Sequence, residues 1–247
     1  MKLVGLLAVI ATGIMLLYAV EDFPGWADPA SPASLHLSPH YITETMEETS
    51  VPNIVTAVLA DYRGFDTMFE TTVILAAGLA VLIILRRFRR EDDHDESDVS
   101  YQDMITQTVC RLMAPFMQLF ALYVIAHGHH SPGGGFQGGV ILGASFILLG
   151  ISYDLKMILA RMRERWNLLL ANVGVLIFAG IGFLSLLLGA NYLDYSVLSK
   201  VLPATTPVEA RSLAMLGVEI GVGMAVMAIV ISIYVNLASH GRHDRGL

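Results

Sequence analysis

Charged side chains are scarce in this sequence. Asp, Glu, Lys and Arg make up 15% of its 247 residues, whereas a soluble domain carries about a quarter. The scarcity is uneven, because long uncharged runs alternate with short, densely charged segments. This distribution excludes a disordered chain and disfavours a single soluble core.

Cysteine and concentrated positive charge are also lacking. Cys110 is the sole cysteine, which excludes an internal disulfide framework and an iron–sulfur cluster held by this chain alone. The net charge is -7, and the basic residues stand in short clusters beside apolar runs. A folded basic face for nucleic acid is therefore not expected. With 55% apolar residues, the chain is predicted to be an integral membrane protein.

Apolar runs are what the sequence has in abundance. Six of them approach the roughly 20 residues that a helix needs to cross the hydrocarbon core. They predict an all-α, polytopic fold with about six spans, at Leu3–Val20, Met68–Leu85, Met104–Ala126, Phe136–Tyr153, Leu168–Ala190 and Leu213–Leu237. The first run also resembles a secretory signal, but it is longer than the usual apolar region of one and no clean cleavage site follows, so a retained helix is favoured.

The basic residues predict the orientation of these spans, because they concentrate on the cytoplasmic side of membrane proteins. With a cytoplasmic amino terminus, eleven of the 15 fall in inner segments. Only Arg63, Lys200 and Arg211 fall outside, and Arg111 lies within a span. Both termini are therefore expected to face the cytoplasm, in the inner (plasma) membrane.

Two connecting segments suggest how the chain is organised. Between the first two spans, the proline-rich first half predicts an irregular external loop, whereas Pro52 and the apolar spacing of the second half predict a short helix at the outer surface. Further on, Arg86–Arg90 is followed by an acidic run from Glu91 to Asp98. This charge reversal is typical of a solvated linker rather than a metal site. We expect a two-helix unit at 1–90, a cytoplasmic linker at 91–100 and a four-helix domain at 101–247.

Carboxylates inside spans are candidate functional groups, because burying an Asp at a helix centre costs about 2.5–3.5 kcal/mol. Glu219 lies in the last span, between Gly217 and Gly221, which form a small-residue packing face. Helical geometry turns Glu219 away from that face. An ion-linked carboxyl is favoured over a protonated or hydrogen-bonded structural one.

Arg63, Asp66 and Glu70 form a second candidate group. In a helix that is continuous through Gly64, they share one face. The arginine would then favour ionised carboxylates and tune where a proton rests. A structural salt bridge at the membrane interface explains the spacing equally well.

Three histidines, His127, His129 and His130, precede a glycine-rich string. Histidine titrates near neutral pH, so the cluster can pass protons or cations, but without a nearby carboxylate or cysteine it does not predict a metal site. A kink is expected at Pro115, beside Arg111. The string lacks the ending of a phosphate loop and predicts a helix break or close packing, at Pro132, Gly133, Gly134, Gly135, Gly139 and Gly143.

The sequence does not indicate that this chain is an enzyme on its own. The sequence shows no Ser-His-Asp arrangement, cysteine nucleophile or dinucleotide fingerprint. No enzyme activity and no cofactor are therefore expected of this chain.

Two strings resemble known families. The stretch from Arg111 to Gly139, with its Ser-Pro-Gly-Gly-Gly-Phe string, and the stretch Gly217–Gly223 resemble the B subunit of Mrp-type multisubunit sodium/proton antiporters, with a likeness that runs from about residue 101 to the end. The stretch from Asn53 to Glu70 is similar to the small E subunit of membrane-bound hydrogenases and to the carboxy-terminal part of the large A subunit of Mrp antiporters.

These resemblances imply a subunit of a cation/proton antiporter in a multisubunit complex. Its implied partners are large proton-pumping subunits, small membrane subunits, Na⁺, H⁺ and the lipid bilayer. Glu70 and Glu219 are implied on or near an ion path, with Asp66, Arg63 and His127 as further candidates. Two alternatives stay open: a scaffold subunit that binds no ion, and a subunit of a hydrogenase-like respiratory complex with redox partners.

Overall fold

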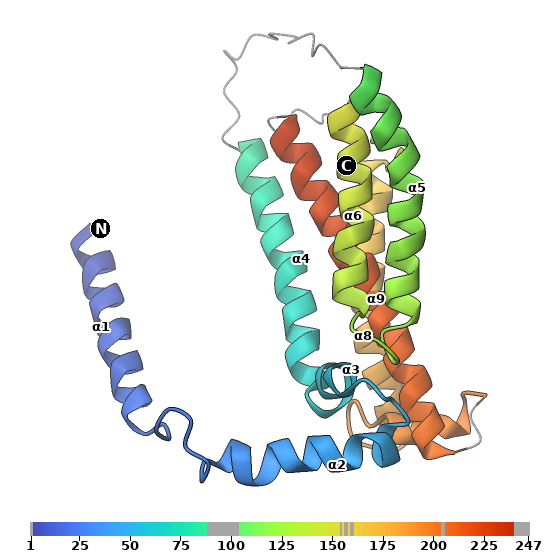
Figure 1. Ribbon diagram of the computed structural model, residues 1–247. Coiled ribbons are helices and arrows are strands. Elements are labelled where there is room, and N and C mark those ends of the chain that lie inside the picture. The colour runs from blue at the N-terminus through green and yellow to red at the C-terminus, as the bar shows by residue number, and fades with distance from the viewer. Residues whose placement is uncertain are drawn as a thin grey trace. The chain divides into compact units, whose positions relative to one another are not determined.

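The computed structural model describes residues 2–87, 104–153, 155, 158, 161–203 and 206–239 (Figure 1). Every regular element in these ranges is helical. Contacts between Cα atoms divide the chain into two compact units, Met1–Glu44 and Thr45–Leu247. The acidic linker expected at 91–100 lies outside the described residues, so the proposed division of the chain at that point stays a prediction.

The first unit contains helix α1 (Lys2–Glu21), a π-helical turn η1 (Ala33–Leu37) and the beginning of α2 (Ser38–Thr49). The prediction of an irregular loop is wrong from Ala33 onward, where η1 leads directly into α2. The Ser38 N–H donates to the Ala33 carbonyl, so η1 and α2 form one continuous helical segment. The Thr43 hydroxyl donates to the Pro39 carbonyl one turn earlier at 3.0 Å, so the polar side chain has a hydrogen-bond partner within the helix.

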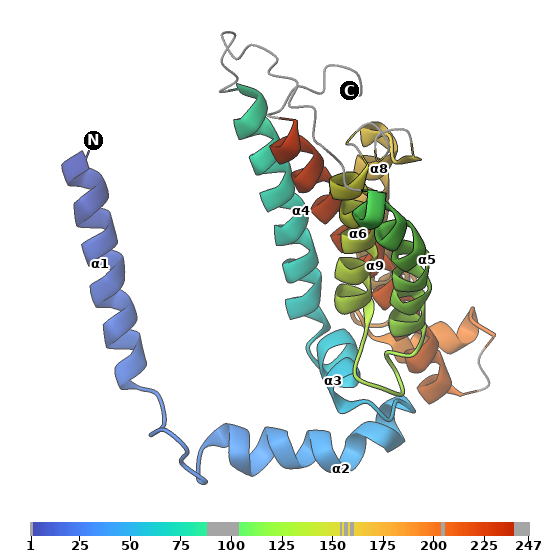
Figure 2. The same ribbon diagram turned by 45° about the horizontal axis from the view of Figure 1, so that its top comes forward.

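Five long helices that alternate in direction make up most of the second unit (Figures 1 and 2). They are α4 (Gly64–Arg87), α5 (Met104–Ala126), α6 (Gly135–Ser152), α8 (Glu164–Leu187) and α9 (Pro207–Ala238). Together with α1, they are long and apolar enough to cross a membrane. The prediction of an all-α fold with six spans is confirmed, and the cytoplasmic placement of both termini stays a prediction.

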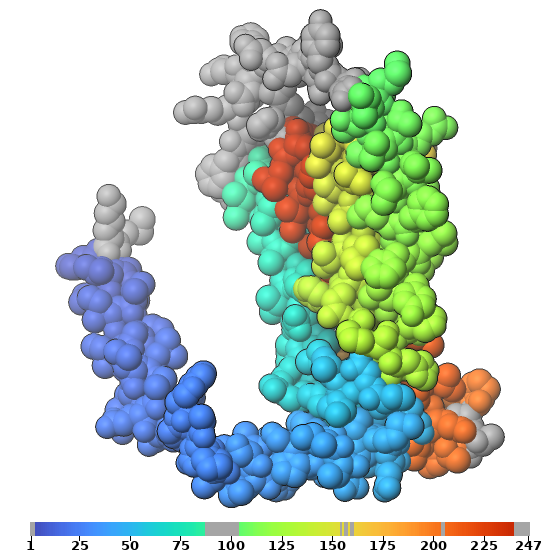
Figure 3. Space-filling model, viewed as in Figure 1, coloured from blue at the N-terminus to red at the C-terminus, as the bar shows by residue number. Residues whose placement is uncertain are grey.

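Helix α9 is the centre of this bundle. In its most apolar window, 72% of the residues are buried, against 22% for α5. It packs against α4, α6 and α8, and the space-filling view shows it largely covered by its neighbours (Figure 3). The polar side chains of Glu219, Ser232 and Asn236 on α9 therefore lie inside protein rather than in lipid.

The span boundaries extend beyond the apolar runs at three helix starts. Helix α9 begins at Pro207, six residues before the expected Leu213, because a capping box stabilises its first turn. The Glu209 N–H donates to the Thr206 hydroxyl at 3.2 Å, and the Thr206 N–H donates to the Glu209 carboxylate at 3.3 Å. Helices α4 and α8 likewise include polar first turns, which hydropathy alone leaves out.

Small residues set the distance between α9 and its neighbours. A Cβ atom on Gly174 of α8 would lie 2.4 Å from the Gly221 carbonyl oxygen, and one on Gly217 would lie 3.0 Å from the Ile181 side chain. Both contacts are to α8, so Gly217 and Gly221 mark the face of α9 that packs there.

Helix α6 approaches α9 from another side, again through glycine. A Cβ atom on Gly139 would lie 2.7 Å from the Gly223 carbonyl oxygen, and one on Gly143 would lie 3.3 Å from the Met227 carbonyl oxygen. The two contacts are one helical turn apart on both helices, which makes a continuous close crossing.

The predicted short helix between the first two spans is confirmed. Helix α3 (Ile54–Ala57) is followed directly by the π-helical turn η2 (Val58–Tyr62). Asn53 rather than Pro52 caps it, because the Asn53 side-chain oxygen accepts the Val55 N–H at 3.1 Å. Helicity is interrupted at Arg63, which has φ -119° and ψ 33°, so the continuous helix considered for residues 63–70 does not form.

Candidate functional site

The Glu219 carboxyl lies in a cradle of glycines. The residue is 6% exposed and lies twelve residues after the first residue of α9. A Cβ atom on Gly128 would lie 2.8 Å from Glu219 Oε2, and one on Gly134 would lie 3.1 Å from Oε1. A Cβ atom on Gly135 would lie 2.0 Å from the Glu219 carbonyl oxygen. The connection between α5 and α6 can approach the carboxyl this closely only because these positions carry no side chain.

The backbone at Gly134 also requires glycine. Its φ of +126° lies in a region that L-residues with a side chain rarely adopt. In this conformation the Gly134 N–H donates to the Val124 carbonyl at 3.2 Å, and the next residue begins α6. The glycine string is therefore the turn that ends one span and starts the next beside Glu219.

A cavity of about 90 Å³ adjoins the carboxyl. Thr56 and Thr67 line it from the segment around α3 and α4, and Gln137 lines it from α6. This volume exceeds the ~10–15 Å³ that one water molecule needs. Two threonines, a glutamine and Glu219 thus line one small space, and its other walls are mostly apolar residues and glycines.

His129 is the ionisable neighbour of Glu219. It is 9% exposed, and its Nε2 lies 3.9 Å from Glu219 Oε2. Its Nδ1 lies 3.5 Å from the Ser212 hydroxyl. Both Nε2 of His129 and Oε2 of Glu219 are buried without a hydrogen-bond partner among the described residues. Such atoms are costly unless a water, a proton or an ion satisfies them.

Burial lowers the pKa of His129 below the ordinary histidine value, and the positive charge of nearby His130 lowers it further. The imidazole is therefore neutral at neutral pH, so it can accept a proton at Nε2 or Nδ1.

A segment from the first half of the sequence holds the glycine turn in place. The Asn53 amide donates to the carbonyls of Gly128 and Ser131 at 2.7 and 2.8 Å. The Thr56 hydroxyl donates to the Gly128 carbonyl at 2.7 Å, and the Asn53 N–H donates to the His129 carbonyl at 2.9 Å. We call these four hydrogen bonds the Asn53 clasp. Sequence reasoning missed both donors, since their acceptors lie more than 70 positions away.

Charged groups also meet where α9 begins. Arg211 Nε lies 2.7 Å from Asp61 Oδ2, and its guanidinium lies 5.8 Å from the centre of the Tyr62 ring. Burial raises the pKa of Asp61, and Arg211 opposes that shift. Burial and a hydrogen bond to Glu48 raise the pKa of Tyr62 to about 12. The sequence marked Arg211 only as an outer basic residue, so this pairing was missed.

The other four ion-path candidates form no hydrogen bond or ion pair with Glu219 among the described residues. Arg63 and Asp66 form an exposed ion pair. Glu70 is exposed on α4 and makes no ion pair or hydrogen bond with a described residue. His127 is exposed and stacks on Tyr123 with ring centres 4.0 Å apart. The ion-path roles suggested for these four residues stay predictions.

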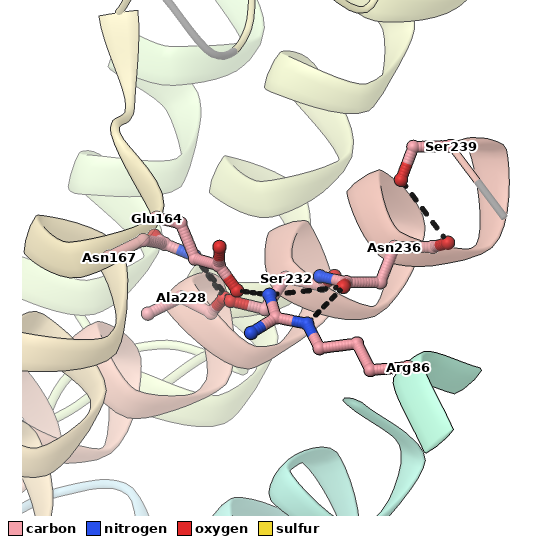
Figure 4. Close-up of polar contacts among 7 residues, drawn as sticks. All are labelled: Arg86, Glu164, Asn167, Ala228, Ser232, Asn236 and Ser239. Carbon is pink, nitrogen blue, oxygen red and sulfur yellow. Dashed lines mark hydrogen bonds and ion pairs between the residues drawn. The ribbon is translucent and has the colours of Figure 1, made fainter. Parts of the chain in front are cut away.

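A second buried polar cluster joins α4, α8 and α9 (Figure 4). Arg86 donates to the Glu164 carboxylate and, at 3.3 Å, to Asn236 Oδ1. The Asn167 amide donates to the Ser232 hydroxyl at 2.7 Å. Glu164, Asn167, Ser232 and Asn236 are all buried. Since each helix supplies at least one member, the cluster fixes how the three helices are packed.

A metal centre is not formed by the described part of the chain. Within it, no group of three or more His, Cys, Asp or Glu side chains could hold one ion.

These features define a multi-pass α-helical membrane protein with a buried carboxyl–imidazole pair beside a small cavity. Residues 105–232 match the family described as a domain related to the MnhB subunit of Na⁺/H⁺ antiporter, and the chain belongs to this family. Residues 6–102 match the family described as the E subunit of MBH. Both resemblances noted in the sequence are confirmed.

Curated relatives are antiporter subunits. The chain is 26% identical over 257 residues to the probable A/B subunit of a K⁺/H⁺ antiporter from Rhizobium meliloti, covering 94% of this chain and 24% of that protein. It is 31% identical over 131 residues to the B subunit of a Na⁺/H⁺ antiporter from Bacillus subtilis, covering 53% of this chain and 90% of that protein. The chain thus spans about a quarter of the first relative and most of the second.

Solved structures share the fold. The Mrp complex from Dietzia sp. DQ12-45-1b contains a chain with a TM-score of 0.67 and 25% identity, matched over 99% of this chain and 26% of that one. A chain of the archaeal membrane-bound sulfane sulfur reductase, a respiratory membrane complex, has a TM-score of 0.58 and 23% identity, over 93% of this chain and 97% of that one. Because its sequence identity is only 23%, the second match shows similarity of fold alone.

Gly135→Ala is expected to destabilise the protein by about 1–3 kcal/mol or more, because the new methyl group would clash with the Glu219 backbone. Gly180→Ala on α8 is the matched control, since a Cβ there meets nothing within 4 Å. The midpoint temperature of unfolding in mild detergent should fall for the first variant and hold or rise slightly for the second. Equal midpoints would contradict the close approach of the turn to α9.

His129 predicts a loss of stability in acid. Its pKa is lower in the folded than in the unfolded chain, so the unfolded chain binds more protons between the two values. The stability associated with this neutral imidazole is present above the unfolded value of about 6.5 and is lost as the pH falls through the folded pKa. Unfolding midpoints measured from pH 8 to pH 5 should fall less steeply in His129→Gln. A slope in His129→Gln equal to that of the wild type would contradict a buried, neutral imidazole at this position.

Proposed function

We propose that this chain is a membrane subunit of an Mrp-type multisubunit cation/proton antiporter, and that it supplies an ion-responsive site at Glu219. One observation carries the second part: the buried Glu219 carboxyl lies 3.9 Å from the His129 imidazole and lines a small cavity together with Thr56, Thr67 and Gln137. Family membership and the antiporter relatives support the first part.

Exchange at such a site needs no covalent chemistry. A buried carboxyl holds either a proton or a cation, because each neutralises the same charge, and so the binding of one disfavours the other. The side chains of Thr56, Thr67 and Gln137 add oxygen atoms around the cavity. Neutral His129, which lies between Ser212 and Glu219, provides a place for the released proton. The chain acts as a transporter subunit in this scheme and not as an autonomous enzyme.

A scaffold that binds no ion is the second candidate. The glycine crossings of α9, the Asn53 clasp and the Arg86 cluster favour it, since all three hold helices together without involving a transported ion. In that case the chain would seal the bilayer and support larger pumping subunits.

Purification through a tag on this chain tests its membership of a complex. Mass spectrometry should find other antiporter subunits in the same particle. Vesicles from cells that lack the chain should show no cation-dependent proton exchange, and the wild-type gene should restore it. Normal exchange without the chain would show that the antiporter does not need it. Redox subunits in the particle would show that the complex is not a stand-alone antiporter.

A further inference from the structure

A second, larger cavity lies at the end of the bundle where α5 and α8 begin and α6 ends, the end that Figure 2 turns toward the viewer. Its volume is about 480 Å³. The residues that line it are Arg111, Ala114, Pro115, Gln118, Leu149, Tyr153 and Arg161. It shares no lining residue with the cavity at Glu219.

Two guanidinium groups in this cavity lack a counterion among the described residues. Neither Arg111 nor Arg161 forms an ion pair or hydrogen bond with any residue that the structure describes, and no described acidic side chain lines the walls. Both arginines are exposed, and like charges that line one cavity repel each other. An anion between them would relieve that repulsion and accept charge-assisted hydrogen bonds from both.

Both arginines lie near the beginning of helices that are long and apolar enough to cross a membrane. Arg111 lies seven residues after Met104, the first residue of α5, or roughly 10 Å along the helix axis. Arg161 lies three residues before Glu164, the first residue of α8. Arginine at such a depth extends its charged end toward the headgroup layer while its methylenes stay in apolar surroundings.

The remaining walls are largely apolar. Ala114 and Leu149 are buried, and the Pro115 ring adds a further hydrocarbon surface. Pro115 has no N–H to donate to the Arg111 carbonyl one turn earlier, so α5 lacks a helical hydrogen bond there. A cavity with cationic groups and apolar walls suits an amphiphile with an anionic head.

We propose that this cavity binds the headgroup of an anionic phospholipid, with the phosphate held between Arg111 and Arg161. Guanidinium groups recognise phosphate with paired hydrogen bonds, and basic pockets between membrane helices are suited to anionic headgroups. The glycerol and the first acyl carbons would lie against Ala114, Pro115 and Leu149. This site is independent of the ion-responsive role of Glu219.

Native mass spectrometry of the detergent-purified complex tests the proposal, with phosphatidylglycerol as the probe. The wild type should retain the lipid, and the double variant Arg111→Gln/Arg161→Gln should bind it about tenfold more weakly or worse. Arg111→Lys/Arg161→Lys should retain intermediate affinity, because the charge is kept and the forked geometry is lost. Arg165→Gln, an exposed arginine in the first turn of α8 outside the cavity, should bind as the wild type does.

Several results would overturn it. Equal retention of phosphatidylglycerol by the double glutamine variant would show that the arginines do not hold the headgroup. Equal retention of phosphatidylcholine would reveal an unselective apolar groove, and displacement of the lipid by millimolar inorganic phosphate would reveal a site for free anions. If the double glutamine variant does not assemble, the double lysine variant and the single variants Arg111→Gln and Arg161→Gln are measured instead. Wild-type affinity for phosphatidylglycerol in all three would refute the proposal.

Discussion

Glu219→Gln is expected to reduce cation-driven proton exchange to background while the complex stays assembled. Glutamine has nearly the size of glutamate, so it fits among Gly128, Gly134 and Gly135 without a clash. It cannot ionise, and therefore it can neither release a proton nor attract a cation. The measurement is the collapse of a pH gradient in everted vesicles on addition of Na⁺ or K⁺, with co-purification of the other subunits as the check on assembly.

Glu209→Gln is the matched control for this variant. Glu209 lies on the same helix but is exposed in the first turn, where it completes the capping box. Glutamine also serves at this position of a capping box, so exchange should stay near the wild-type rate. Wild-type exchange by an assembled Glu219→Gln complex would instead support the scaffold role.

Arg86→Met is expected to destabilise the protein by about 3–5 kcal/mol, because it leaves the buried Glu164 carboxylate without its cationic partner. The side chain of Glu164 is 4% exposed, so water cannot easily replace Arg86 as the hydrogen-bond donor to its carboxylate. Thermal unfolding in detergent measures the loss, which is a large part of the stability of a typical domain.

The double variant Arg86→Met/Glu164→Leu distinguishes the loss of the ion pair from the cost of leaving the Glu164 carboxylate unpaired. Replacing both members of a buried ion pair by apolar residues is often neutral or stabilising. We therefore expect the double variant to recover most of the stability lost in Arg86→Met. Arg165→Met, which changes the exposed arginine next to Glu164, should have little effect. An unchanged midpoint in Arg86→Met would show that the ion pair contributes nothing to packing.

The spans and the direction of Glu219 could be predicted from the sequence, because both depend on local spacing. Apolar runs identify helices of the right length, and a two-residue offset places Glu219 on a different side of α9 from Gly217 and Gly221. The structure shows those glycines against α8 and Glu219 against the glycine turn. Local rules were sufficient here because α9 is one regular helix.

The partners of these residues could not be predicted, because they depend on tertiary structure. The sequence offered His127, His129 and His130 without distinction. The Asn53 clasp binds the carbonyls of Gly128, His129 and Ser131. His129 then lies against Glu219, while His127 stacks on Tyr123. The pair formed by Arg86 and Glu164 spans 78 positions, so no sequence pattern marks it.

The Asn53 clasp joins residues from the two family matches: its donors lie within residues 6–102 and its acceptors within residues 105–232. Because one polypeptide carries both, the donors and acceptors meet at an effective concentration in the millimolar range or above. Four hydrogen bonds worth about 1 kcal/mol each roughly balance the cost of association at about 1 mM, and the packing of α6 against α9 adds to them. If the same two halves were made as separate chains, they would need a larger buried interface to stay associated to the same extent. The covalent connection therefore takes the place of additional buried interface area.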